Sequence, residues 1–397
     1  MNVCPILALN PGSTSLRFLV SDGDGRDVLR GTIASIGSTP LLRWRHTSAS
    51  DGSTPVRAAN HEEATQLVLD LTTDMPEAPR AAGVRFVHGG DDFAGPVRVD
   101  GSVLAKLSSL ERLAPLHNRP GIATLRALES RFGTHCPRVA VFDTAFHASM
   151  PSTARAVGIP LELAQKHGIR RYGFHGLALE SVIDRFREGI GARLNRHRMI
   201  LLHLGGGCSA TAALDERSVD TSMGFSPLEG LLMSTRSGDL DPAAVAWLAH
   251  AEGWTADQVV DTLNHRSGLL GISGRSGDYR EVERLAAEGA PRARAALDLF
   301  TYRVRKQIGA MAAVLGGIDQ ILFSGGIGEH SATARASICH GLEWAGIALD
   351  PRRNELAVEG EATISSERSR VGVHVIAADE ERLIALRTVE VLAKETL

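Results

Sequence analysis

Three glycine-rich turns that follow apolar, strand-like runs are the part of this sequence best suited to chemistry. They lie within residues 6–20 (ILALNPGSTSLRFLV), 199–215 (MILLHLGGGCSATAALD) and 320–330 (QILFSGGIGEH). Glycine lets backbone N–H groups approach a ligand closely, and successive N–H groups form a concave site for anions. One such turn is weak evidence, but three in one chain predict a polyphosphate held from several sides.

No lysine lies in any of these turns, so they are not P-loops, which require a Gly-Lys pair. The 43 basic residues include four lysines (Lys106, Lys166, Lys306 and Lys394), which leaves 43 − 4 = 39 arginines. Genomic base composition explains most of this excess. Phosphate charge at the turns would therefore be met by arginine, Mg²⁺ or backbone dipoles, and the planar guanidinium group binds two oxygens at once.

Length and composition are typical of a globular enzyme of two domains. A chain of 397 residues is long for one core, and 43% hydrophobic with 22% charged residues is ordinary for a globular protein. The net charge of −3 argues against a nucleic-acid surface, and no apolar run is long enough to span a membrane. The N-terminus lacks a signal-peptide pattern, and the four scattered cysteines form no metal-type pair or disulfide framework. We therefore expect a cytoplasmic enzyme.

Strand and helix patterns alternate along the chain, which predicts an α/β fold. Strands are expected on both sides of the first two turns, before the third, and at 84–90, 138–147 and 373–381. Residues 37–60 indicate irregular strand and loop, and 220–241 indicate a long functional loop. Pro120 is expected in the first turn of its helix. Helices are expected at 62–71, 103–113, 119–132, 242–252, 256–264, 292–315, 334–344 and 381–396.

The strand, glycine turn and strand pattern recurs in both halves, which indicates two related domains with a cleft between them. We place the boundary just after the strand that ends near His147, and we expect the last helix to pack back on the first domain. The expected domains are 1–149 plus 381–397 and 150–380. Asp143 follows the apolar run of that strand, where parallel-sheet proteins place ligand-binding side chains. A helix cap is the alternative role for Asp143.

Long signatures in this chain resemble the acetate kinase family, the short-chain carboxylate kinases of the actin-like ATPase fold. The resemblance covers nearly the whole chain. It implies two actin-like domains with a nucleotide cleft between them, a homodimer, and reversible, Mg²⁺- and ATP-dependent phosphorylation of acetate or a close homologue, with Mn²⁺ as an alternative metal. The motifs that carry it are NPGSTSLRF, RFVHGG, LAPLHN, VAVFDTAFHASMP, YGFHG, HLGGG, SVDTSMGFSPLEGLLMSTRSGDLDP, GLLGISG and GGIGEHS.

The resemblance implies catalytic roles for Arg85, Arg236, Asp143 and His175. Phosphoryl transfer to a carboxylate brings two anions together, so the protein must supply positive charge and geometry. Taken alone, each arginine would be interpreted as a solvated surface pair, and each histidine as an ordinary core or surface residue. His117 and His203 match supporting histidines of the family. A metal cluster that includes His147 is disfavoured, because the spacing shows no His-rich ligand motif.

The same resemblance implies contacts to nucleotide and metal. Asn10 and Glu380 match Mg²⁺-linked positions, and the adjacent Glu381 leaves open which carboxylate faces the metal. Arg17 stands where lysine is usual. The small or ordinary residues at 326 and 327 favour ATP over diphosphate as the donor. The residues expected to contact the nucleotide are Asn10, Ser13, Arg17, His203, Gly205, Gly206, Gly207, Asp278, Arg280, Gly326, Ile327 and Gly328.

The acceptor pocket implied by the resemblance is hydrophobic. It consists of Val87, Leu116, Phe174 and Pro227, with Arg85 beside the carboxylate. One methylene in such a pocket is worth only about 1–3 kcal/mol, so acetate over propionate is a preference at most.

Several positions depart from the family pattern. HLGNG is HLGGG here, which places Gly206 at an asparagine position, and GIGEN is GIGEH, which places His330 at another. NPGSTS also resembles butyrate kinases, and LHNPAN is LHNRPG. The leading hypothesis is acetate kinase activity. The alternatives are a propionate or butyrate kinase and a non-catalytic actin-like ATP-binding protein. A serine hydrolase is disfavoured, because no G-x-S-x-G motif occurs.

Overall fold

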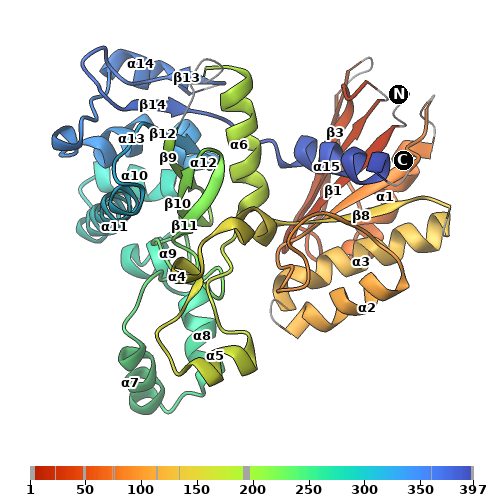
Figure 1. The fold of residues 1–397 in the computed structure, drawn as a ribbon, viewed down its shortest axis with the longest axis horizontal. Helices are drawn as coiled ribbons and strands as arrows, with labels where there is room; N and C mark the ends of the chain where they lie inside the picture. Colours follow the sequence, from red (N-terminus) through yellow and green to blue (C-terminus); the bar gives the residue numbers. More distant parts are fainter. Residues whose placement is uncertain are drawn as a thin grey trace. The chain divides into compact units, whose positions relative to one another are not determined.

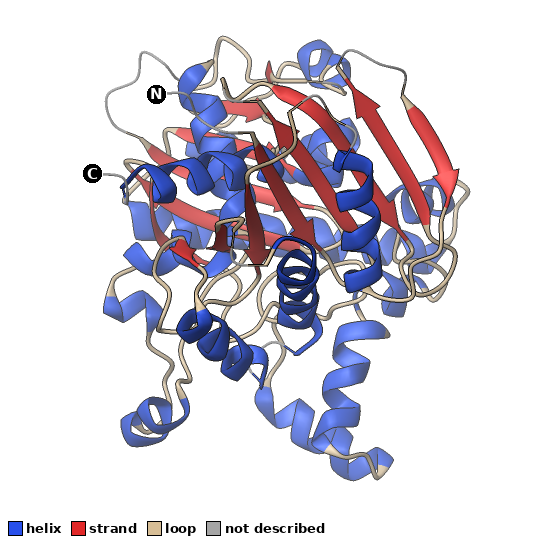
Figure 2. Cartoon of the chain, turned by 90° about the vertical axis from the view of Figure 1, so that its right-hand side faces the viewer, coloured by secondary structure: helices blue, strands red, loops and turns tan. Residues whose placement is uncertain are grey.

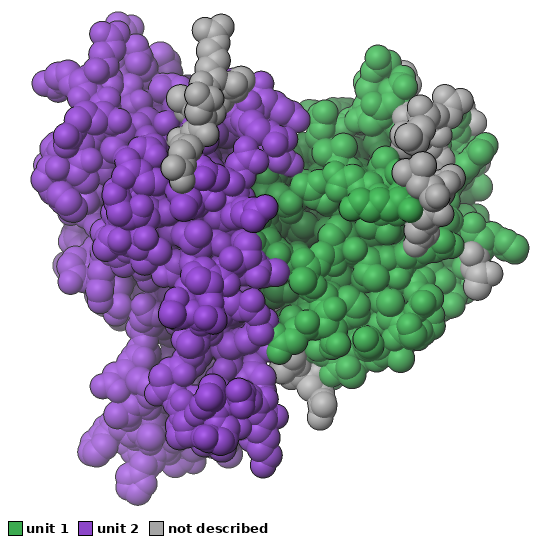
Figure 3. All heavy atoms as spheres, viewed as in Figure 1, with its two compact units in different colours: residues 1–146, 176–181, 379–397 green, residues 147–175, 182–378 purple. Residues whose placement is uncertain are grey.

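The computed structural model describes residues 5–22, 24–47, 51–73, 75, 77–112, 115–133, 135–190, 197–358 and 360–394, except for the side chains of residues 112 and 115–117. The chain forms two compact units, coloured separately in Figure 3. Unit 1 comprises residues 1–146, 176–181 and 379–397, and unit 2 comprises 147–175 and 182–378. The domains expected from the sequence, 1–149 plus 381–397 and 150–380, stay a prediction. These units group residues 176–181 with the N-terminal part of the chain.

Unit 1 is built on an eight-stranded sheet in the order β5-β4-β3-β2-β1-β6-β8-β7. Figure 1 labels β1, β3 and β8 of this sheet, and Figure 2 shows strands in red. Strands β1, β6 and β8 are parallel, whereas β1 to β5 form an antiparallel meander. Two regular strands, β4 and β5, therefore occupy part of residues 37–60, where we expected irregular strand and loop. The strands are β1 (Ile6–Pro11), β2 (Leu16–Ser21), β3 (Asp27–Ala34), β4 (Leu41–His46), β5 (Gly52–Pro55), β6 (Ala81–Phe86), β7 (Val97–Arg98) and β8 (Arg138–Phe142).

Helices cover both faces of this sheet because its central strands are apolar on both faces. Leu7 and Leu9 of β1 pack into one core with α1 (His61–Thr73) and α3 (Pro115–Phe132). Ile6 and Ala8, which point the other way, pack with α15 (Glu380–Lys394). Unit 1 also contains α2 (Gly101–Ser109), η1 (Leu110–Arg112), Asp143–Phe146 of the 3₁₀ segment η2 (Asp143–Ser149) and the first turns of α6 (Gly176–Glu188).

Pro120 does not lie in the first turn of its helix, contrary to the expectation from the sequence. Helix α3 begins five residues earlier, at Pro115, and contains Pro120 in its interior. Pro115 takes the first helical position, which proline suits because its missing N–H would have no partner there.

Unit 2 contains a six-stranded sheet in the order β11-β10-β9-β12-β14-β13. Helix α11 (Pro291–Leu315) ends at Gly316, which adopts a left-handed conformation at its C-cap. The expected helix over 334–344 divides, because the helix that starts at Ala332 ends at Cys339 and Gly341 has φ +82°. The strands are β9 (Arg198–Leu204), β10 (Cys208–Leu214), β11 (Arg217–Thr221), β12 (Gln320–Ser324), β13 (Ala362–Thr363) and β14 (Gly372–Val375). The other helices are α4 (Ser152–Arg155), α5 (Leu161–His167), α7 (Pro242–Glu252), α8 (Ala256–His265), α9 (Gly268–Ser273), α10 (Tyr279–Ala287), α12 (Gly325–His330), α13 (Ala332–Cys339), η3 (Glu343–Ala345) and α14 (Pro351–Leu356).

The two sheets share one topology. In unit 1 the order β3-β2-β1-β6-β8 matches β11-β10-β9-β12-β14 in unit 2, with the first three strands antiparallel and the last two parallel to the central one. The first glycine turn joins β1 to β2, and the second joins β9 to β10, so they occupy equivalent places. The predicted α/β class and the repeat of its pattern are thus confirmed. Among the described residues, no helix is long and apolar enough to cross a membrane.

We predict that the packing of α15 on unit 1 tolerates no side chain at Gly83 of β6. A Cβ atom there would lie 2.7 Å from Cγ2 of Ile384 and would also collide with Thr388. Gly83→Val should therefore lower the free energy of unfolding by about 1–3 kcal/mol, as overpacking does. Denaturant unfolding measures the change. Gly101→Ala is the control, since a Cβ at Gly101 meets nothing within 4 Å. Equal stability of the Gly83→Val variant and the wild type would contradict the packing described.

Candidate active site

Asn10 is the centre of a polar group in unit 1. It lies near the end of β1, just before the first glycine turn, and is 1% exposed. Its Nδ2 donates to Glu380 Oε2 at 2.7 Å and to Glu381 Oε1 at 2.5 Å, and its Oδ1 accepts from Arg85 Nη1 at 2.9 Å. One buried amide therefore joins the first turn, the start of α15 and the strand β6.

Arg85 and Asp143 form a two-point ion pair at the carboxyl ends of the parallel strands β6 and β8. Arg85 Nη2 lies 2.6 Å from Asp143 Oδ2, and Arg85 Nε donates to Asp143 Oδ1 at 3.1 Å. The sheet register pairs Phe86 with Phe142. Arg85 and Asp143, one residue to either side of this pair, therefore lie close enough to meet across the adjacent strands. Arg85 lies within β6, so the strand expected over 84–90 begins earlier, at Ala81, and ends at Phe86, before the glycines of the motif.

Burial and the neighbouring opposite charges shift the pKa in opposite directions, both for Arg85 and for Asp143. Burial raises the pKa of the Asp143 carboxyl, and the guanidinium of Arg85 opposes that rise. Burial alone would lower the pKa of Arg85, but the charges of Asp143 and Glu380 hold it above its ordinary value. Arg85 thus stays a cation, and most of its charge is offset within unit 1.

Arg17 adds a second cation to the same group. It lies opposite Asn10 in the β1–β2 register, 3.0 Å from Glu380 and 3.1 Å from Glu381. The charge of Glu380 raises the pKa of Arg17. Burial raises the pKa of Glu381, and Arg17 opposes that rise. Arg17 therefore contacts both carboxylates.

The oxygen donors of this group suit Mg²⁺, although the geometry does not choose between Glu380 and Glu381, because both bond Asn10. Carboxylate and amide oxygens are the ligands that Mg²⁺ takes. Among the described residues, no three His, Cys, Asp or Glu side chains form a set that could hold an ion by themselves. Mg²⁺ often binds through one or two carboxylates completed by phosphate oxygens and water, and Asn10 and Glu380 fit that pattern.

The second and third glycine turns lie side by side in unit 2. They follow β9 and β12, which are parallel neighbours with Ser324 paired to His203. A Cβ atom on Gly205 would lie 3.7 Å from the backbone nitrogen of Gly326. His203 Nδ1 and Ser324 Oγ are 3.1 Å apart. Residues 121 positions apart in the sequence therefore meet at one edge of the sheet.

His175 lies against the second turn. Its Nδ1 is 3.1 Å from Ser209 Oγ, and its ring centroid is 4.7 Å from that of His203. A Cβ on Gly207 would lie 3.1 Å from His175 Nε2 and 3.5 Å from Arg236 Nη1. The predicted residues His175, His203 and Arg236 are thus brought together around the second turn.

Arg236 is a largely buried cation without an acidic partner among the described residues. Its Nη1 donates to the carbonyl of Pro227 at 3.1 Å, and burial lowers the pKa of its guanidinium. In the part of the chain that the structure describes, no carboxylate forms an ion pair with it. A buried charge without a counter-ion is unfavourable, so Arg236 is suited to receive an anionic ligand.

The third turn forms the start of α12, and its residues differ in exposure. Gly325 has φ +75°, and its N–H donates to Glu329 Oε1 at 2.8 Å. Gly326 is exposed, with nothing within 4 Å of a Cβ built on it, whereas Ile327 and Gly328 are buried. The open backbone at Gly326 can approach a ligand.

Asp278 and Arg280 lie at the N-terminus of α10 and pair with each other at 2.7 Å on the surface. The neighbouring Gly277 packs on Ser234, whose N–H donates to the carbonyl of Gly206 at 3.2 Å. This chain of contacts links the 276–280 segment to the second turn.

The other predicted residues are placed as follows. Val87 is buried directly after β6, Phe174 is buried beside His175, and Pro227 accepts the hydrogen bond from Arg236. Ser13 is exposed in the first turn. Leu116 and His117 lie outside the residues whose side chains are described, so their expected roles stay predictions.

The two departures from the expected pattern have different surroundings. Gly206 is exposed, and a Cβ there would meet only Ser234 Oγ, at 3.9 Å, so the site has room for a side chain. His330 Nδ1 donates to the carbonyl of Val358 at 2.9 Å. That bond holds its imidazole against the segment that follows α14.

Sequence reasoning missed Arg335, which is fully buried beneath the third turn. Its guanidinium donates to the carbonyls of Gly328 and Glu329 and to Asn354, at distances between 2.7 and 2.9 Å. It thereby satisfies carbonyls at the C-terminal end of α12, where a positive charge is favourable. An arginine in a helical pattern is usually interpreted as exposed, and no other signal in the sequence points to this role.

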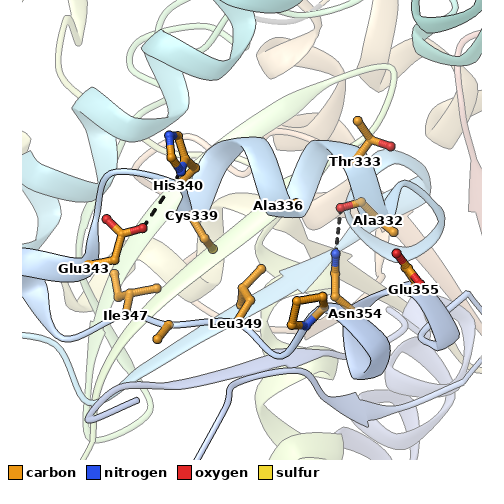
Figure 4. Close-up of a pocket in the computed structure, with 12 residues that line it drawn as sticks. Ala332, Thr333, Ala336, Cys339, His340, Glu343, Ile347, Leu349, Asn354 and Glu355 are labelled. Carbon is orange, nitrogen blue, oxygen red and sulfur yellow. Dashed lines mark hydrogen bonds and ion pairs between the residues drawn. The ribbon is translucent and has the colours of Figure 1, made fainter. Parts of the chain in front are cut away.

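A pocket of about 410 Å³ lies between α13 and α14 (Figure 4). Its lining includes Cys339, Leu349 and Asn354, and it contains none of the predicted site residues. Figure 4 shows Asn354, whose Nδ2 donates to the carbonyl of Ala332 at 2.8 Å. The predicted residues are therefore concentrated at the sheet edges and not at this pocket.

Comparisons with known proteins identify the family of this chain. The model of the Acetokinase family matches residues 5–386. An acetate kinase of Heliobacterium modesticaldum is 42% identical over 98% of this chain and 99% of its own, and one of Caldanaerobacter subterraneus is 44% identical over 96% and 98%. The crystal structure of Porphyromonas gingivalis acetate kinase has a TM-score of 0.89 at 35% identity, covering 98% of this chain and all of that one. A propionate kinase from Francisella tularensis has a TM-score of 0.90 at 35% identity, with 97% and 99% coverage.

We predict that Arg85 and Arg17 differ sharply in their effect on stability. Arg85→Met leaves the buried Asp143 carboxylate unpaired, which should lower the free energy of unfolding by about 3–5 kcal/mol. Arg17→Met removes a side chain that is 43% exposed, and Asn10 remains bonded to both glutamates, so we expect a loss of about 0–1 kcal/mol. Denaturant unfolding of the two variants compares them. Similar losses would show that the Arg85–Asp143 pair is not the main electrostatic contact of unit 1.

Proposed function

We propose that this chain, which belongs to the acetokinase family, catalyses reversible transfer of the γ-phosphoryl group of ATP to acetate. The products are acetyl phosphate and ADP. The observation that carries the proposal is Arg236, a largely buried guanidinium beside His175 and the second glycine turn that has no carboxylate partner among the described residues. Such a cation supplies what a phosphoryl group in transfer requires.

In the proposed step, a carboxylate oxygen of acetate attacks the γ-phosphorus in line with the bond to the β-phosphate oxygen. A new P–O bond forms as that bond breaks, and its electron pair leaves with ADP. No base is needed, because acetate is already an anion at neutral pH. The protein's part is therefore positioning and charge, as is general for phosphoryl transfer.

Each of the four predicted catalytic residues has a role in this step. Arg236 and His175 donate to the equatorial oxygens of the phosphoryl group as negative charge spreads over them. Arg85 orients the acetate carboxylate, and Asp143 holds Arg85 through two contacts, 2.6 and 3.1 Å long. Gly206, Gly207 and Gly326–Gly328 would offer backbone N–H groups to the nucleotide, whereas the N–H of Gly205 already donates to the carbonyl of Gly207 at 3.0 Å.

Mg²⁺ is the proposed metal, held through Asn10 and Glu380 together with phosphate oxygens. When bound it neutralises charge on the polyphosphate. Mn²⁺ accepts similar oxygen ligands and is the alternative.

A homodimer and a cytoplasmic location are further parts of the proposal. The dimer is the assembly that the family resemblance implies. Sedimentation at micromolar concentration tests the dimer, and a single monomeric species would contradict it. The use of ATP suits the cytoplasm.

The proposed activity predicts acyl hydroxamate from purified protein, ATP, Mg²⁺ and hydroxylamine, with acetate preferred to propionate and butyrate. GTP and diphosphate replace ATP in parallel reactions to test the donor. Arg236→Ala should lower kcat by at least about a hundredfold, the effect of removing one donor to a developing charge. Failure to form hydroxamate with any of the three acids would overturn the proposal. Wild-type turnover by the Arg236→Ala variant would overturn the role of Arg236.

Gly206 provides a separate prediction about nucleotide use. An asparagine there would add an amide next to the phosphates, a contact worth about 1–3 kcal/mol. The nearest atom to a Cβ is Ser234 Oγ at 3.9 Å, so the side chain has room. Gly206→Asn should therefore raise kcat/KM for ATP about tenfold or more. Gly206→Ala is the control for volume alone. An unchanged or lower kcat/KM for the Gly206→Asn variant would show that the site has adapted to glycine.

A further inference from the structure

His147 is a buried histidine that the proposed step does not use. It lies in η2 and is 1% exposed. Its Nδ1 is 2.9 Å from Ser218 Oγ, and its Nε2 is 2.9 Å from the carbonyl oxygen of Phe174. Its ring thus bridges β11 and the residue that precedes His175.

These contacts determine the protonation of the imidazole. A carbonyl oxygen accepts only, so Nε2 carries the proton and donates to Phe174. Nδ1 then accepts from the hydroxyl of Ser218. Burial lowers the pKa of His147 to about 4, so the ring is neutral at physiological pH.

The two residues on either side of Phe174 both have positive φ angles. Gly173 has φ +79°, and a Cβ there would lie 2.5 Å from the ring of His147. His175 has φ +61°, a left-handed conformation that is costly for a residue with a side chain. Such a conformation persists only where neighbouring contacts hold it.

We infer that His147 is a positioning residue for His175, which it holds in its left-handed conformation through the Phe174 carbonyl and the close packing of Gly173. This inference rests on the proposed function, in which His175 donates to the phosphoryl group. His147 itself touches neither reactant in this assignment. Its removal should lower turnover and leave substrate binding largely intact.

The decisive experiment is a double-mutant cycle between His147→Phe and His175→Ala. Phenylalanine keeps the volume of the ring but can neither donate nor accept. We expect His147→Phe to lower kcat about 10- to 100-fold, with the KM values for ATP and acetate changed less than about threefold. In the His175→Ala background the same change should lower kcat by less than about twofold, since its target is gone.

Conservative variants test the hydrogen bonds separately. His147→Gln can donate to the Phe174 carbonyl and accept from Ser218, so it should recover most of the lost turnover. Ser218→Ala removes only the partner of Nδ1 and should lower kcat by a few fold, with the same dependence on His175. Ser218→Ala also keeps the cycle usable if His147→Phe does not fold.

His374 provides a matched control in the same unit. It is also buried, its pKa is also lowered to about 4 by burial, and it bonds Gln320 and Thr363 in the sheet. His374→Phe should lower the melting temperature and leave kcat within about twofold of wild type. This variant separates loss of a buried histidine from loss of the His175 support.

The outcomes distinguish the inference from the proposed function. An inactive wild-type protein, or a His175→Ala variant with full turnover, would overturn the proposed role of His175 and the inference with it. An active wild type whose His147 and His175 effects multiply independently would overturn the inference alone. A loss with His147→Phe that vanishes in the His175→Ala background, with recovery by glutamine, is the expected result.

Discussion

Positive charge that is removed from water must be matched by something, and this constraint shapes both units. In unit 1 the guanidinium of Arg85 is matched by Asp143 and by Glu380, 2.6 and 3.6 Å away. The buried Arg335 of unit 2 is matched by carbonyl oxygens and by an asparagine side chain. Among the described residues, Arg236 is matched by a carbonyl and a sulfur atom. The difference in compensation explains why Arg85 is tied into its unit, whereas Arg236 is poised for an anion.

The shared topology of the sheets explains where these groups lie. A glycine turn joins the first two strands of each unit, and a parallel strand beside the first ends at the same edge. In unit 1 that neighbour carries Arg85, and in unit 2 it leads into Gly325 and Gly326. Within each unit, groups from distant parts of the sequence therefore come together without long loops. The exception is the 222–241 segment, which carries Arg236 and is held by contacts such as the bond from the Ser234 N–H to the second turn.

Buried polar side chains give rigid support to the reactive groups. Asn10 uses its whole amide to hold Arg85 and two glutamates, and Asp143 holds Arg85 at two points. In our proposal, His147 likewise holds His175 in position. Because phosphoryl transfer to a carboxylate needs little covalent chemistry, the geometry of donors around the phosphate determines the rate. Much of the buried polar structure is suited to that geometry.

The sequence by itself determined the α/β class, the repeated pattern of strand, glycine turn and strand, and the family, because local periodicity, glycine and long contiguous motifs act over a few residues. Only the tertiary structure decided which charges compensate one another. The strand expected over 84–90 is β6, which ends at Phe86 before the glycines, and Pro120 lies inside a helix that starts earlier than expected. Nothing local distinguishes Arg335, which is 0% exposed, from a surface arginine, and nothing local predicts the contact of His147 with Phe174. Burial and pairing arise between residues far apart in the chain, so they depend on packing that no short stretch of sequence contains.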